Sequence, residues 1–96
     1  MQLTHKTSIT IEPIKSSEFD HKVTTVFAPI IREELDKRIA LGKTDGSRVT
    51  VADGPLAYVN SLCWTSEQDA NDWISFIEGV AADNDINLIL KSVDPL

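Results

Sequence analysis

The stretch from Tyr58 to Phe76, YVNSLCWTSEQDANDWISF, constrains the fold more than any other part of the chain. Its first half alternates in the manner of a strand, and its second half begins with residues that can cap a helix, either Thr65 with Gln68 or Ser66 with Asp69. A strand must therefore run directly into a helix, with one tryptophan on each element. One strand face carries Leu56, Tyr58, Asn60, Leu62 and Trp64, and the apolar helix stripe contains Ala70, Trp73, Ile74, Ile77 and Ala81.

Other strands are indicated on both sides of this stretch. Residues 3–12 end with Ile9 and Ile11 in alternation, and a proline follows that ends this strand or places it at a sheet edge. Residues 48–51, RVTV, precede the turn signal Asp53-Gly54, which favours a hairpin with the long strand. The last predicted strand, residues 86–93, carries apolar groups on both faces: Ile86, Leu88 and Leu90 on one, Ile89 and Val93 on the other.

Residues 17–41 carry apolar side chains mostly three or four positions apart, which predicts an amphipathic helix. Ser17 is the expected N-cap, and Gly42 is the expected C-terminal stop. Pro29 lies in the middle, where it removes a backbone donor and crowds the preceding turn. We expect one helix kinked at this proline. The competing interpretation is a strand at residues 23–27 and a helix that starts with Pro29.

The order of elements, β-α-β-β-α-β, predicts a ferredoxin-like α+β fold as one domain over residues 1–96. Two helices then cover one face of a four-stranded antiparallel sheet. The long strand and the last strand carry apolar groups on both faces, and such strands should be buried on both sides. We therefore expect a homodimer with its sheets face to face, and the residues expected at the dimer or partner face are Leu62, Ile89 and Val93.

The segment W-T-S-E-x-x-A-x-x-W, with the long strand before it, resembles the dimeric α/β-barrel superfamily, of which the antibiotic-biosynthesis-monooxygenase-like proteins are the best-known members. The resemblance covers residues 48–93 and rests on Trp64, Ser66, Glu67, Ala70 and Trp73. It implies a homodimer with a cavity in each protomer between sheet and helices. Some members are cofactor-free oxygenases and others degrade haem. No histidine follows the first tryptophan here, so the haem-degrading site is not carried over.

The composition argues against several classes of function. The net charge is −6 and the nine basic residues are scattered, so the clustered cations that nucleic acids require are missing. The single cysteine, Cys63, cannot form an internal disulfide or a cysteine-based zinc or iron–sulfur site. With no apolar run of membrane-spanning length and no secretory signal, we expect a cytoplasmic protein without membrane association.

No residue carries a strong catalytic or metal-binding signature. Cys63 is expected to be an inert buried thiol, and His5 and His21 are expected at the surface. The DNDIN segment has the spacing of a calcium loop, but leucine replaces the glycine at its sixth position and Asp94 replaces the glutamate at its twelfth. The isolated glycines form no phosphate-binding loop. We therefore expect no catalytic residue, no metal and no cofactor.

The two tryptophans are interpreted either as core packing or as walls of a ligand pocket. In the second interpretation the pocket contains Tyr58, Asn60, Trp64 and Trp73, and the tyrosine and asparagine supply its polarity.

The function expected from these features is that of a small non-catalytic homodimeric protein that binds a protein partner or a small hydrophobic ligand, or that assists assembly. Small size, acidity and the lack of motifs also suit an accessory protein of a bacterium or a virus. The alternative is a cofactor-independent monooxygenase-like enzyme acting on a small hydrophobic or aromatic molecule. A third interpretation is a monomer that offers its open sheet face to a different protein. Fold alone does not decide among these.

Overall fold

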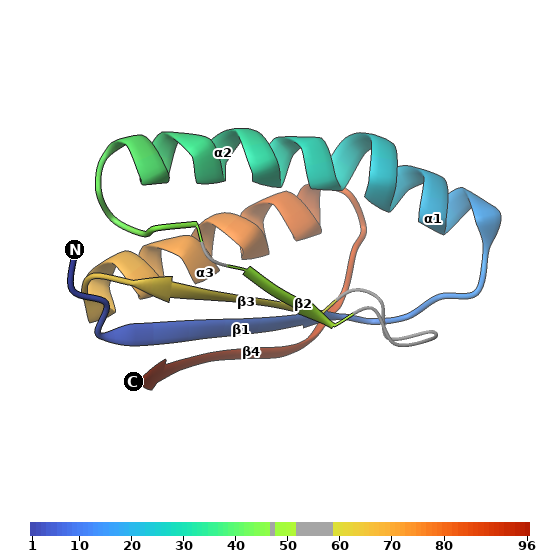
Figure 1. The fold of residues 1–96 in the computed structure, drawn as a ribbon. Helices are drawn as coiled ribbons and strands as arrows, with labels where there is room; N and C mark the ends of the chain where they lie inside the picture. The colour runs from blue at the N-terminus through green and yellow to red at the C-terminus, as the bar shows by residue number, and fades with distance from the viewer. Residues whose placement is uncertain (47, 52–58) are drawn as a thin grey trace.

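The computed structural model describes residues 1–46, 48–51 and 59–96, with side chains for residues 1–46 and 60–96 (Figure 1). It confirms the α+β class. None of its helices, over these described residues, is long and apolar enough to cross a lipid bilayer. The elements in chain order are β1 (His5–Ile11), α1 (Ser17–Lys22), the π-helical turn η1 (Val23–Phe27), α2 (Ala28–Ala40), β2 (Arg48–Val51), β3 (Val59–Trp64), α3 (Glu67–Asp83) and β4 (Leu88–Pro95).

The strands form an antiparallel sheet in the order β2-β3-β1-β4. β1 is central, and its Thr7 lies opposite Leu62 of β3 on one side and Val93 of β4 on the other. The register between β1 and β4 shifts between Thr10 and Ile11, so β4 carries one extra residue there. The last strand begins and ends two residues later than predicted. The predicted Asp53-Gly54 turn and the start of the long strand at Leu56 lie outside the described residues.

The segments α1, η1 and α2 run on from one another as a single long helix over residues 17–40 (Figure 1). This confirms the kinked helix and excludes a strand at residues 23–27. In η1 the backbone N–H of Ala28 donates to the carbonyl of Val23, five residues earlier. Pro29 follows at the start of α2; its ring would crowd the preceding turn of a regular α-helix, and the wider π turn accommodates it. The N-cap is Ser16 and not Ser17, because the Oγ of Ser16 accepts the Phe19 N–H at 3.0 Å.

The helix after β3 begins where the sequence predicts. Ser66 is its N-cap, and its Oγ accepts the backbone N–H of Asp69 at 3.1 Å. The Asp69 carboxylate does not complete a capping box. It accepts a hydrogen bond from the Thr65 hydroxyl at 3.2 Å and lies 3.7 Å from the Lys43 ammonium. The cap therefore also ties the start of α3 to the segment that follows α2.

Both helices lie on the same side of the sheet, and the core fills the space between them (Figure 1). Trp64 and Trp73 are completely buried there, with ring centroids 5.2 Å apart. The indole N–H of Trp64 donates to the Thr7 hydroxyl at 2.9 Å, and that hydroxyl donates to the Leu62 carbonyl at 3.3 Å. The tryptophan pair thus joins β3 to α3 at the centre of the core.

The described side chains on the open face of the sheet are more polar than the sequence pattern indicates. The register pairs Lys6 with Cys63 and Ser8 with Ser61 on this face, and the two serine hydroxyls are 3.3 Å apart. Among the strand side chains that the structure describes, the large apolar groups that are exposed belong to the edge strand β4, where Ile89 is 54% and Leu90 is 51% exposed.

Two of the three residues expected at a partner face lie elsewhere. Leu62 is only 1% exposed, and its register with Thr7 places it under the helices. Val93 also pairs with Thr7 and packs against the core. They point inward because the helices cover the face that carries Trp64, a choice that strand alternation alone leaves open. Ile89 remains exposed.

Replacement of Thr7 by valine tests the buried hydrogen bond that Trp64 makes. Thr7→Val keeps the shape but leaves the indole N–H without an acceptor, so the free energy of unfolding should fall by about 1–3 kcal/mol. Thr7→Ser keeps the hydroxyl and loses one methyl group, at a cost of about 1 kcal/mol. Urea denaturation of both variants measures the two effects. A larger loss in Thr7→Ser than in Thr7→Val would show that the methyl group matters more than the hydrogen bond.

Candidate functional site

A cavity lies between the long helix and the sheet, with a volume of about 150 Å3. The walls of the cavity are mainly apolar because the helices and strands around it line it with side chains from their core-facing sides. β1 contributes residues two apart, and the long helix contributes residues four apart, the spacings that keep side chains on one face. The described residues that line the cavity are Ile9, Ile11, Val23, Phe27, Ala28, Ile31, Arg32, Asn60 and Ile77.

Two polar side chains, Arg32 and Asn60, interrupt this apolar lining. Arg32 is exposed to solvent, whereas the isoleucines of β1 are buried, so the guanidinium marks the opening of the cavity. Asn60 faces the cavity from β3 and is half-buried opposite Ile9. Within residues 1–46 and 60–96, neither side chain has a hydrogen-bonding or ion-pair partner. Both are therefore available to a bound molecule.

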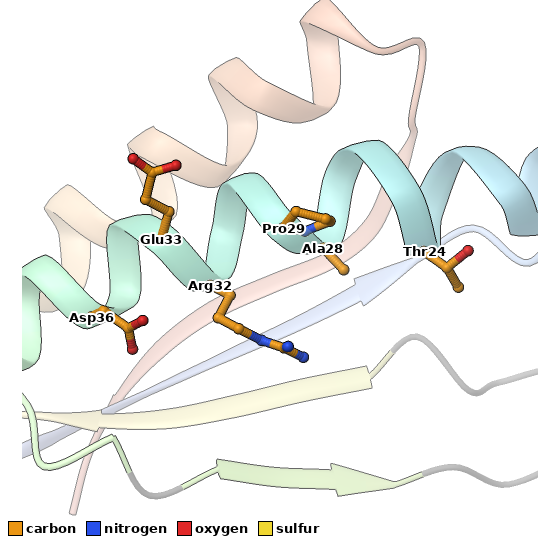
Figure 2. A pocket seen from close by; sticks show the side chains of 6 residues that line it. All are labelled: Thr24, Ala28, Pro29, Arg32, Glu33 and Asp36. Carbon is orange, nitrogen blue, oxygen red and sulfur yellow. The ribbon is translucent and has the colours of Figure 1, made fainter.

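A second hollow, of about 320 Å3, runs along the flank of the long helix (Figure 2). It shares Ala28 and Arg32 with the cavity. In Figure 2 the Arg32 side chain extends toward the side where the strands lie, while Glu33 points away from it. The two hollows thus meet at one cation. The residues that line the flank hollow are Thr24, Ala28, Pro29, Arg32, Glu33 and Asp36.

The ion pairs that α2 makes among the described side chains do not include Arg32. Glu34 lies 3.2 Å from the Arg38 guanidinium and 4.0 Å from the Lys37 ammonium. Arg38 also lies over the rings of Trp73 and Phe76, 5.3 and 5.4 Å from their centroids. Arg38 therefore holds α2 against α3 and has a structural role, whereas Arg32 has no such contact with the described side chains.

Of the two interpretations of the tryptophans, the structure confirms core packing, and the cavity lies elsewhere. Of the four pocket residues expected from the sequence, Asn60 lines the cavity. Trp64 and Trp73 are fully buried in the core and are not among its lining residues. Tyr58 lies outside the described residues. No motif in the sequence identifies Arg32 and the apolar residues of the long helix as cavity residues, although Pro29 beside them indicates an irregular helix.

The other residues considered for chemistry lie apart from this cavity. Cys63 is half-exposed on the open sheet face opposite Lys6. His5 lies 2.8 Å from the Thr4 hydroxyl and 3.9 Å from the Glu67 carboxylate, and His21 is exposed on α1. In the described part of the chain, no three histidine, cysteine or acidic side chains gather as a metal site would require. The site can thus enclose an apolar group and donate hydrogen bonds from Arg32 and Asn60.

Replacement of Asn60 tests whether its amide serves binding or stability. Asparagine is disfavoured in strands, so Asn60→Val should leave the free energy of unfolding unchanged or raise it by up to about 1 kcal/mol. Thermal unfolding monitored by circular dichroism measures this. Asn71→Val on the exposed surface of α3 is a control for loss of an amide away from this cavity. Marked destabilisation by Asn60→Val alone would assign the Asn60 amide a structural role.

Comparison of the chain with known proteins finds no matching family model, no similar curated protein and no similar solved structure.

Proposed function

We propose that this protein is a non-catalytic homodimeric binding protein that holds a small, largely apolar molecule between its long helix and its sheet. The observation that carries the proposal is the cavity itself, a partly open apolar pocket whose two polar side chains, Arg32 and Asn60, have no hydrogen-bonding or ion-pair partner among the described side chains. Ligand sites in proteins combine an apolar lining with a few polar groups in the same way. The pocket is partly open, and its volume of about 150 Å3 can hold an apolar group of about the size of benzene.

Binding is better supported than catalysis. General acid–base chemistry needs a histidine, a carboxyl group or a similar titratable side chain next to the reacting atoms. The described lining of the cavity supplies a guanidinium and an amide, together with apolar groups. A monooxygenase-like enzyme, the alternative, would need such a group to activate its substrate. The tryptophans that would wall an aromatic substrate pocket are packed against each other in the core.

The fold proposed for this function is ferredoxin-like, with two copies joined through their sheets as in dimeric α/β barrels. The strand order β2-β3-β1-β4, with helices after β1 and β3, supports the ferredoxin-like part. The uncovered sheet face, with Ile89 and Leu90 exposed, supports the association.

The oligomeric state tests the dimer. Light scattering after size-exclusion chromatography should give twice the mass of one chain over a range of concentrations. Leu90→Asp places a charge on the exposed part of β4 and should shift the protein to the monomer. Leu41→Asp introduces the same charge at a still more exposed leucine beyond α2 and should leave the dimer intact. A wild-type monomer at every concentration would exclude association of two copies and favour docking of a different protein on the open face.

Cavity filling tests ligand binding separately. Benzene at ten times its Kd should stabilise the folded protein by about 1.4 kcal/mol, because it binds the folded state alone. Ala28→Leu fills the space beside Arg32 and should abolish this stabilisation, whereas Ala40→Leu at the exposed end of the same helix should preserve it. Urea denaturation with and without benzene gives the values. No stabilisation of the wild type would contradict the proposed function.

A further inference from the structure

We infer that the ligand of the cavity is a small organic carboxylate, whose apolar body fills the cavity and whose carboxylate pairs with Arg32. This inference rests on the proposed function, since it names the ligand class of that same cavity. It combines a partly open apolar pocket of limited volume with one exposed cation among the described residues that line it.

The negative charges around Arg32 disfavour a dianionic ligand more strongly than a monoanionic one. The guanidinium is the one cation among the described residues that line the two hollows, whereas Glu33 and Asp36 also line the flank hollow. The whole chain has a net charge of −6. A phosphate dianion would meet more repulsion here than a carboxylate and would find no second cation. The planar fork of arginine also matches the two oxygens of a carboxylate, which it can bind with two parallel hydrogen bonds.

Asp36 competes only weakly for Arg32. It lies four residues after the arginine, and a base followed by an acid at this spacing is the less favourable order on a helix. The two side chains form no ion pair in the structure, although Arg38 and Lys37 on the same helix both pair with Glu34. The Arg32 guanidinium is therefore not neutralised by an ion pair with Asp36.

Asn60 lies across the cavity and can donate a second hydrogen bond from its amide. Because Arg32 is exposed, the carboxylate would stay partly hydrated, which keeps the cost of removing it from water low. The apolar body of the ligand would meanwhile displace water from the isoleucine and phenylalanine side chains. Affinity would thus come from burial of the body, and selectivity from the anion.

A calorimetric comparison of benzene, benzamide and benzoate tests this inference. The wild type should bind benzoate about tenfold or more tightly than benzamide, its uncharged analogue, because charge-assisted hydrogen bonds are the stronger ones. Arg32→Gln should remove this preference and leave the affinity for benzene unchanged. Lys37→Gln removes the same charge from the same helix, away from the cavity, and should change neither affinity.

Two further variants sharpen the test. Arg32→Lys keeps the charge but loses the fork, so its preference for benzoate should lie between those of the wild type and Arg32→Gln. Asp36→Asn removes one of the two carboxylates that line the flank hollow with Arg32, and it should tighten benzoate binding a few-fold without affecting benzene.

The outcomes separate the inference from the proposed function. If benzene binds but benzoate is not preferred over benzamide, or if Arg32→Gln and Lys37→Gln behave alike, the carboxylate inference is wrong and the binding function stands. If neither benzene nor benzoate binds the wild type, both are wrong. Selective loss of the benzoate preference in Arg32→Gln supports both.

Discussion

The contact between Trp64 and Trp73 is the interaction on which the rest of the structure depends. The two rings are fully buried and lie 5.2 Å apart, on a strand and on the helix that directly follows it. The hydrogen bond from Trp64 to Thr7 extends this contact to the central strand β1. On the other side, Phe76 stacks beside Trp73, and Arg38 of the long helix covers both rings. Two helices and two strands are thus fixed relative to one another around one aromatic pair.

The long helix determines where the core stops and the cavity begins. Its second half is held by Arg38 and by the buried Leu35. Its first half carries the π turn before Pro29, and there Val23 and Phe27 face the sheet across the cavity. A helical irregularity therefore coincides with the enclosed space, as π turns often do with functional sites.

Much of the fold could be predicted from the sequence because its signals are local. The cap at Ser66, the alternation before it and the apolar stripe after it fix a strand and a helix without knowledge of the rest of the chain. The apolar spacing that continues through Pro29 likewise favours a helix over a strand at residues 23–27, and the structure confirms the helix. The cap, the alternation and the apolar stripe depend only on the spacing of residues along the chain, which can be read from the sequence.

The placement of the site could not be predicted because it depends on packing between distant segments. Alternation along β3 predicts that Leu62 and Asn60 share a face, but it does not predict that the helices cover that face. The bulge between β1 and β4 leaves both Ile89 and Leu90 exposed, which alternation does not foresee. Arg32 gives no signal in the sequence, since an arginine on a helix is ordinarily a solvated side chain. Arg32 becomes a candidate binding residue only because the structure places it beside an apolar cavity.

The burial of both tryptophans has a consequence for spectroscopy. The chain contains no others, so its indole emission arises from the dry core and from two closely spaced rings. Such emission should be blue-shifted and poorly accessible to quenchers dissolved in water, and it should change sharply when the core comes apart. Because neither ring lines the cavity, the same signal should be nearly silent when a small molecule enters. The protein thus carries a built-in optical reporter of its folding that does not register the occupancy of its cavity.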